Sequence, residues 1–285
     1  QLVLVGCGAL SELYYAPALK GLGSAEAIEV TALVDLNPGR LDVLGGMFPK
    51  AHRLSTIEEL APGEADCAVV ASPQKFHGPQ SISLLRRGIH VLCEKPMASN
   101  VTEARSMVFA AQQANRLLSV GLFRRFFPSS ELMHQLVTGL ALGAPISFRW
   151  VEGGPFNWPA ASASFFQKSA SPGGVFADVG VHVVDLLLSW FGEPIDCDYE
   201  DDAMGGIEAN ARLGLRFASG VTGVLRLSRD TAIPNGTNIR FERGAVWFQG
   251  ASADSVSVRF NGSSHAIQGT LHEVSDGGAE LVSGV

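Results

Sequence analysis

Short, almost uninterrupted apolar runs alternate with helix-like stretches over residues 1–122 of the chain. Such runs predict parallel β-strands that are buried on both faces, because helices cover both sides of a parallel sheet. The pattern therefore predicts an α/β domain with a parallel sheet. The expected strands are Leu2–Val5, Ile28–Val34, Ala65–Ala71, His90–Cys93 and Leu117–Leu122, and the expected helices are Leu10–Leu22, Arg40–Met47, Gly78–Arg87 and Val101–Asn115.

A different pattern begins after Phe123 and predicts a second domain over residues 123–285. From residue 209 onward, short strand-like runs follow one another at a spacing that is typical of an antiparallel sheet. Because helices precede this sheet, the domain is expected to be α+β. The expected elements before the sheet are a helix over Ser129–Leu142, a strand over Ile146–Val151, an irregular loop over Gly153–Gly174 and a helix over Ala177–Phe191.

Composition and charge exclude several classes of protein. The net charge is −7 and no long cluster of Lys or Arg stands out, so nucleic acid is not an expected partner. No apolar stretch reaches the roughly 18–20 residues that span a membrane, so no membrane partner is expected. The four cysteines include no Cys-x-x-Cys pair, which favours a reducing cytoplasm. Gln1 stands directly before the first expected strand with no Met before it, so the true N-terminus and an export signal stay open.

The turn after the first expected strand has the form that binds dinucleotides. Gly6 permits a tight turn, and Gly8 lets the backbone approach a pyrophosphate at the start of the next helix, where free N–H groups favour anions. Glycines also serve ordinary turns, and the third small position holds Ser11. The strand–turn–helix context favours the dinucleotide interpretation, with Ala9 and Leu10 in the same turn.

Asp35 ends the second expected strand. A carboxylate there can accept both ribose hydroxyls and repels a 2′-phosphate, which favours NAD over NADP. Arg40 lies near in sequence and could accommodate that phosphate, so NADP stays the alternative cofactor. Asp35 also has an ordinary interpretation as a turn residue in front of Asn37-Pro38-Gly39.

Lys95 directly follows the apolar run His90–Cys93 and Glu94, and precedes Pro96. The carboxyl ends of strands in open α/β sheets face the ligand crevice. Lys95 is therefore a candidate catalytic residue that exchanges a proton with a substrate hydroxyl. The alternative, and the commoner fate of a lysine, is a solvated surface charge.

Asp178, His182 and Asp185 are spaced at i, i+4 and i+7, which puts them on one face of a helix. In the functional interpretation, Asp178 and His182 project into a site as hydrogen-bonding and proton-transfer groups. In the structural alternative, Asp178 caps the helix and His182 is a core histidine. No cysteine or further histidine lies nearby in sequence, so no metal site is expected.

These motifs in this order resemble the glucose–fructose oxidoreductase / inositol dehydrogenase / rhizopine-catabolism (Gfo/Idh/MocA) family. The resemblance covers most of the chain. It implies a dinucleotide-binding Rossmann domain over 1–122, then a substrate-binding and oligomerisation α+β domain over 123–285 with a large, mostly antiparallel open sheet. It rests on Gly6-x-Gly8, Ser72-Pro73-x-x-x-His77, Glu94-Lys95-Pro96, Arg124-Arg125-Phe126, and Gly173-Gly174 to Asp178-x-x-x-His182.

The resemblance also implies a role for each matched residue. Lys95 corresponds to the family's catalytic lysine, His182 to the proposed acid/base, and Asp178 to the residue that positions substrate and histidine. Arg125 corresponds to an arginine near the nicotinamide and the substrate. The residues expected to line the nicotinamide ribose are Ser72, Pro73, His77 and Glu94.

Two features depart from the family pattern, and one further residue is a candidate for contact with the substrate. Gln74 stands where the family usually has Asn after the proline, which weakens the ribose contact expected there. Family members usually continue past a point like Val285 into a further helix, so a truncated C-terminus is expected. Trp158, in the irregular loop, is a candidate for stacking on a sugar face, with loop packing as an alternative of equal weight.

The function implied by the resemblance is an NAD(P)-dependent oxidoreductase that interconverts a hydroxyl and a ketone on a sugar, polyol or sugar nucleotide. Either His182 or Lys95 is then the proton acceptor, and the sequence leaves this choice open. Two alternatives are a non-catalytic NAD(P)-sensing regulatory protein and an NAD-dependent glycosidase of the same fold. Retention of Lys95, Asp178 and His182 argues against the sensor. The family also implies a homodimer or homotetramer.

Overall fold

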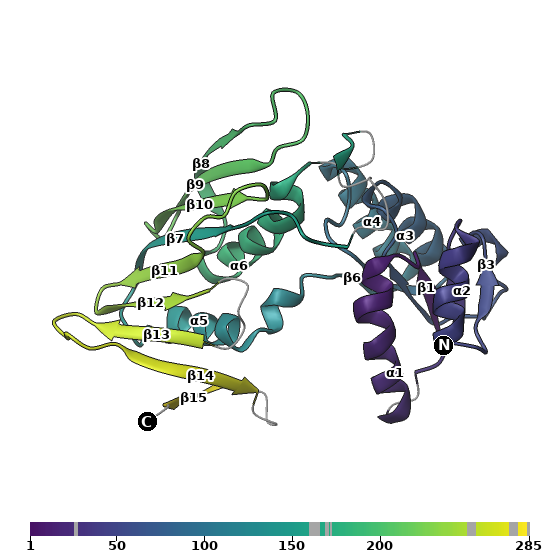
Figure 1. The fold of residues 1–285 in the computed structure, drawn as a ribbon, viewed down its shortest axis with the longest axis horizontal. Coiled ribbons are helices and arrows are strands. Elements are labelled where there is room, and N and C mark those ends of the chain that lie inside the picture. Colours follow the sequence, from purple (N-terminus) through teal and green to yellow (C-terminus); the bar gives the residue numbers. More distant parts are fainter. Residues whose placement is uncertain are drawn as a thin grey trace. The chain divides into compact units, whose positions relative to one another are not determined.

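The computed structural model describes residues 1–25, 28–159, 166–168, 171, 173–249, 255–273 and 279–283. The chain divides into two compact units, which Figure 1 shows with purple to blue and with teal to yellow elements. One unit comprises Gln1–Gly121 with Trp158–Pro172, and the other comprises Leu122–Asn157 with Gly173–Val285. The segment from Trp158 thus belongs with the first unit, although it follows the first strand of the second in sequence.

The first unit is built on a six-stranded parallel sheet with the order β3-β2-β1-β4-β5-β6. This order reverses direction between β1 and β4, and open α/β sheets bind ligands at such a switch point. The five expected strands are present, and β3 is a short edge strand that the apolar pattern did not reveal. The strands are β1 (Leu2–Val5), β2 (Val30–Val34), β3 (His52–Leu54), β4 (Cys67–Val70), β5 (His90–Cys93) and β6 (Leu118–Val120).

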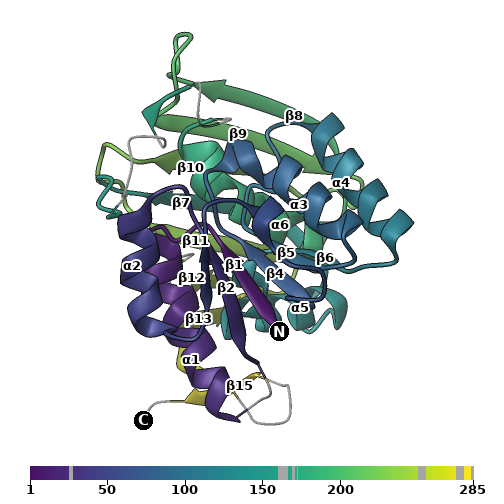
Figure 2. The same ribbon diagram turned by 90° about the vertical axis from the view of Figure 1, so that its right-hand side faces the viewer.

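Alternate side chains of the parallel strands enter two separate cores. Val3 and Val5 pack with residues of α3 and α4, whereas Leu2 and Leu4 pack with residues of α1 and α2. Figure 2 shows these two helix pairs on opposite sides of the parallel strands. Burial on both faces explains why these strands are continuous apolar runs in the sequence. The helices are α1 (Ala16–Ala25), α2 (Pro38–Met47), α3 (His77–Arg86) and α4 (Val101–Ala114).

The second unit is a nine-stranded sheet with the order β15-β14-β13-β12-β11-β7-β10-β9-β8, and α5 and α6 pack on one of its faces (Figure 1). Neighbouring strands pair antiparallel except for β7 and β10, which are parallel. The expected α+β architecture with a mostly antiparallel sheet is confirmed. The elements are α5 (Pro128–Thr138), β7 (Pro145–Gly153), α6 (Val181–Phe191), β8 (Pro194–Asp201), β9 (Asn210–Phe217), β10 (Thr222–Ser228), β11 (Gly236–Phe241), β12 (Gly244–Phe248), β13 (Ser255–Phe260), β14 (Ile267–Glu273) and β15 (Ala279–Ser283).

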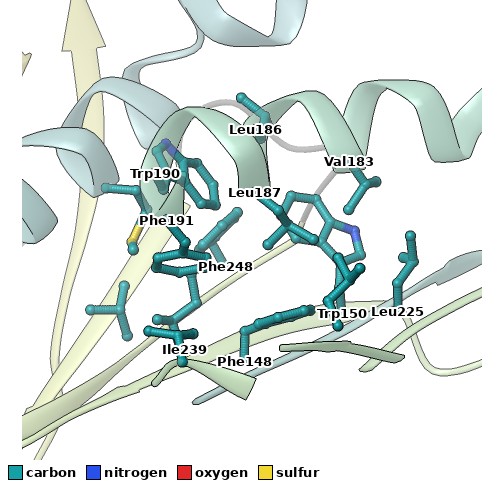
Figure 3. Packing of buried hydrophobic residues seen from close by; sticks show 14 of the residues in the cluster. Phe148, Trp150, Val183, Leu186, Leu187, Trp190, Phe191, Leu225, Ile239 and Phe248 are labelled. Atoms are coloured by element: carbon teal, nitrogen blue, oxygen red, sulfur yellow. The ribbon is translucent and has the colours of Figure 1, made fainter. Parts of the chain in front are cut away.

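The apolar side of α6 anchors this helix on the sheet (Figure 3). The Trp190 ring stacks on the ring of Trp150 from β7, with centroids 6.2 Å apart. Helix α5 is shorter than expected: it ends at Thr138 and not at Leu142, because Leu140 adopts a positive φ of 52°. In the part of the chain that the structure describes, no helix is long and apolar enough to cross a membrane.

Candidate active site

The glycine turn after β1 passes very close to the loop after β4. Gly6 has a φ of +92°, and a Cβ added to it would lie 2.5 Å from the nitrogen of Ser72, so only glycine fits. Ser11, at the third motif position, is buried and donates its hydroxyl to the Gly6 carbonyl at 2.5 Å. A Cβ added to Gly8 would meet no atom within 4 Å, which leaves open space beside the turn. The turn leads into a π-helical segment, η1 (Ser11–Tyr15), and then into α1.

Asp35 and Arg40 both bind this turn. Asp35 accepts the N–H of Cys7 at 2.7 Å and that of Asn37 at 2.8 Å, one on each carboxylate oxygen. Arg40 donates from Nε to the Cys7 carbonyl at 2.6 Å and from Nη2 to Glu12 at 2.7 Å. Asp35 is therefore a turn residue and also a brace for the glycine turn. Each of its oxygens keeps acceptor capacity for a ribose hydroxyl.

Glu94, at the end of β5, is a buried carboxylate next to Lys95. It accepts the hydroxyl of Tyr15 at 2.7 Å and the backbone N–H of Lys95 at 3.0 Å. Burial, together with the neighbouring Glu94 charge, raises the pKa of Tyr15 and keeps the phenol a donor. A Cβ on Gly121 would lie 2.9 Å from Glu94 Oε1, so the glycine makes room for this carboxylate. No motif in the sequence links Tyr15 to Glu94, so the sequence did not predict this contact.

His77 joins the loops that follow β4 and β5. Its ring is 1% exposed, with Nε2 2.8 Å from the Ser72 carbonyl oxygen and Nδ1 2.9 Å from that of Pro96. The Ser72 hydroxyl donates to Gln80 at 2.6 Å, and Pro73 is exposed. The ring thus ties together the two loops that carry the expected ribose-lining residues. Direct contact of these residues with a ribose stays a prediction.

The segment that begins at Trp158 contacts the rest of the first unit at two points. The Trp158 ring stacks on that of Tyr14, with centroids 5.6 Å apart and planes at 21°. The Ser171 hydroxyl donates to the side-chain oxygen of Gln74 at 3.1 Å. Gln74, the departure from the family pattern, therefore has a hydrogen-bond partner. One face of Trp158 is occupied by packing, and stacking of a sugar on the other face stays a prediction.

In the second unit, the 3₁₀ turn η4 (Phe123–Phe126) contacts α6 at two points. Arg125 donates to Asp185 from Nε at 2.7 Å and from Nη2 at 2.5 Å, and these hydrogen bonds raise the pKa of the guanidinium. Phe123 meets the buried His182 ring edge-on, with centroids 5.0 Å apart and planes at 69°. The helical spacing puts Asp185 on the same face as His182. The structure shows that Asp185 pairs with Arg125.

Asp178 lies half-buried in a π-helical turn, η6 (Phe176–Gly180), directly before α6. The buried Glu208 carboxylate accepts the N–H of Phe176, the first residue of this turn, at 3.0 Å, and that of Gly174, two residues before it, at 2.7 Å. A Cβ on Gly174 would lie 1.8 Å from the Glu208 carbonyl oxygen, so this glycine is required by Glu208. Glu208 lies 34 residues after Gly174 and belongs to no motif, so the sequence did not predict its contact with this turn. Among the described residues, no three His, Cys, Asp or Glu side chains gather to hold a metal ion.

The order of the parallel sheet, its glycine turn and the carboxylate at the end of β2 define a dinucleotide-binding Rossmann domain, followed by an α+β domain. Residues 1–122 match the model of the oxidoreductase family with an NAD-binding Rossmann fold, and residues 131–247 match that of the GFO/IDH/MocA C-terminal domain. The chain therefore belongs to the GFO/IDH/MocA family of oxidoreductases, as its motifs indicate.

Over the aligned residues, named relatives are about a quarter identical to the chain. It is 26% identical to 1,5-anhydro-D-fructose reductase of Ensifer adhaerens over 76% of the chain and 66% of that protein. It is 26% identical to scyllo-inositol 2-dehydrogenase (NADP(+)) of Bacillus subtilis over 80% of the chain and 70% of that protein. The WlbA dehydrogenase of Bordetella pertussis, solved with NADH and UDP-GlcNAcA, has a TM-score of 0.82 at 24% identity, covering 92% of this chain and 77% of that one, and shows the shared fold.

Proposed function

We propose that the chain is an NAD(P)-dependent dehydrogenase that interconverts a hydroxyl and a ketone on a sugar, polyol or sugar nucleotide. The observation that carries this proposal is the place of Lys95. It lies two residues after the end of β5, which is two strands from β1 and its glycine turn, and its N–H donates to the buried Glu94. The named relatives, a sugar reductase and an inositol dehydrogenase, support the choice of substrate class.

The residues around the glycine turn fit a dinucleotide. The space beside Gly8 admits a pyrophosphate, and Asp35 keeps acceptor capacity for a ribose. When bound, the nicotinamide supplies the acceptor for a hydride. We infer a preference for NAD, because the Asp35 carboxylate repels a 2′-phosphate and the Arg40 guanidinium already pairs with Glu12.

Lys95 and His182 are the groups assigned to proton transfer. During oxidation, the C–H bond of the carbinol breaks with its electron pair, and the hydroxyl proton passes to a base. If the base is the imidazole of His182, the ammonium of Lys95 stabilises the developing alkoxide. If the base is a neutral Lys95, His182 orients the hydroxyl. In either case Asp178 is assigned to position the substrate and His182.

The first test is NADH formation from NAD across a panel of polyols, free sugars and sugar nucleotides. Lys95→Ala should lower kcat about 100-fold or more while the Kd for NADH stays unchanged. Lys50→Ala, at an exposed lysine of the same unit, is the matched control. Equal turnover in the Lys95 variant would remove the lysine from the mechanism. NADH binding without oxidation of any panel member would favour the sensor, and glycoside hydrolysis without net NADH would favour the glycosidase.

We further propose that the chain forms a homodimer or homotetramer through the sheet face opposite α5 and α6. On β10, exposed Arg226 alternates with buried Leu225 and Leu227, so it points away from the helices. It lies directly opposite Arg212 of β9, and Arg212 pairs with Asp198 of β8, so this face carries charges of both signs that suit polar contacts with a second copy. Light scattering at low and high salt tests this: a monomer at every concentration would contradict it, and Arg226→Glu should shift an oligomer's dissociation constant.

A further inference from the structure

Three consecutive side chains of η4 make contacts in three different directions. A 3₁₀ helix has three residues per turn, so neighbouring side chains point about 120° apart. Phe123 contacts His182, and Arg125 pairs with Asp185 three residues further along α6. Arg124, between them, points to Glu152 on β7. The turn therefore spans the space between the helix that carries His182 and the sheet beneath it.

The Arg124–Glu152 contact is a buried, two-pronged ion pair. Arg124 donates from Nη1 to Glu152 Oε2 at 2.9 Å and from Nη2 to Oε1 at 2.7 Å. Both residues are 9% exposed. The indole N–H of Trp150 donates to the same carboxylate at 3.1 Å. The acid is thereby fixed from two sides, and the planar guanidinium allows one orientation of the arginine.

Stability alone does not account for an ion pair in this place. Removal of two charges from water costs about as much as their attraction returns, and an apolar pair of similar volume is often equally stable. A parallel two-bond geometry does supply direction, because it fixes both the distance and the plane of the partners. Here the ion pair fixes the orientation of η4. Because Phe123 is part of η4, the ion pair also fixes the orientation of the Phe123 ring.

We propose that Arg124 is a positioning residue for His182: its ion pair with Glu152 holds η4 on β7, so that Phe123 fixes the orientation of the imidazole. An edge-on aromatic contact restricts the rotation of both rings, because the ring edge is drawn to the neighbouring ring face. The inference rests on the proposed function, since His182 is the group whose orientation matters. Arg125 acts from the same turn by holding Asp185 of α6.

The test compares Arg124→Met, Glu152→Gln and the double variant in the full chain. Each single variant should lower the melting temperature, because one partner is left buried without its counter-charge. The double variant carries no charge and keeps an acceptor for the Trp150 indole, so its melting temperature should return toward that of the wild type. Its kcat should nevertheless stay about 10- to 100-fold low with an unchanged KM for NAD, because the imidazole is misoriented. Arg53→Met with Asp42→Asn removes an exposed ion pair and is the control.

A spectroscopic readout separates this inference from the proposed function. In protein with isotope-labelled histidine, the ring proton signals of His182 should move in the double variant, because the Phe123 ring shifts relative to them; His182→Gln assigns the signals. Phe123→Leu, which leaves the ion pair intact, should produce the same displacement and the same loss of kcat. Wild-type kcat and unmoved signals in a folded double variant would overturn the inference. Absence of dehydrogenase activity in the wild type would instead contradict the proposed function. The ring proton signals of His182 would then still show whether Arg124 positions the imidazole.

Discussion

The two units build their candidate site residues by different means. In the first, backbone groups of neighbouring loops make most of the contacts: Gly6 lies against the backbone of Ser72, and His77 contacts two carbonyl oxygens. In the second, charged side chains join segments far apart in sequence. Arg124 and Glu152 are 28 residues apart, and Arg125 and Asp185 are 60.

Short sequence motifs therefore reveal the site contacts of the first unit better than those of the second. A turn that needs glycine at fixed spacing leaves that spacing in the sequence, because only certain residue types reach the required backbone conformation. An ion pair between distant segments leaves no such spacing, because the fold alone brings its members together. The glycine turn of the first unit should therefore be sensitive to an added Cβ atom, and the ion pairs of the second unit to the loss of a charged partner.

The largest effect is expected from Gly6→Ala. The added Cβ would collide with the Ala71–Ser72 backbone at a positive φ, so the free energy of unfolding should fall by about 2–4 kcal/mol and NADH binding should be lost. Gly8→Ala is the matched variant: its Cβ meets nothing in the protein, so the fold should keep its stability while NADH binding weakens. Chemical denaturation and titration calorimetry measure both. Equal damage to the fold in both variants would contradict this account of the turn.

A smaller loss is expected from Glu208→Ala in the second unit. The substitution leaves the N–H groups of Gly174 and Phe176 buried without an acceptor, which should lower the free energy of unfolding by about 2–3 kcal/mol. Glu193→Ala, at an exposed carboxylate next to α6, should change it by less than about 0.5 kcal/mol. Similar denaturation midpoints for the two variants would show that the carboxylate does not stabilise η6.

Alkaline pH should weaken the first unit by a further, smaller amount. Burial, followed by the Asp35 charge, raises the pKa of Cys7 from 9.0 to about 12, and burial raises that of Cys93 likewise to about 12. Between pH 9 and 12 the unfolded chain loses these protons first, so stability falls as pH rises. Cys7→Ala should reduce the loss at pH 10 by about 1 kcal/mol relative to wild type. An identical pH dependence of unfolding in both proteins would contradict the raised pKa.

The smallest effect is expected at the partly exposed pair of Arg125 and Asp185. Asp185→Asn removes the charge but keeps the shape, so the free energy of unfolding should change by less than about 1 kcal/mol. Thermal unfolding of Asp185→Asn and Glu208→Ala side by side shows which contact contributes more to stability, the Arg125–Asp185 pair or the Glu208 hydrogen bonds. A larger loss at Asp185 would mean that η4, more than the Glu208 cap, sets the stability of α6.

Most of the first unit could be predicted from local pattern. The continuous apolar strands, the turn at Gly6 and Gly8 and the acid at Asp35 all lie where the sequence places them. The edge strand β3 was missed because its residues are exposed or half-buried and carry no apolar run. In the second unit β8 was missed for the same reason, since nearly all of its residues are exposed.

Local residue patterns predict the type of each domain and the family, and they single out the candidate residues Lys95, Asp178 and His182. Those features depend on residue type at short, fixed spacing, through backbone conformation and the periodicity of burial. The hydrogen-bond partners become visible only in the tertiary structure: Glu94 accepts from Tyr15, and Glu152 accepts from Arg124. The physical reason is that a buried polar group needs a partner but not one at any particular distance along the chain, so the fold selects it.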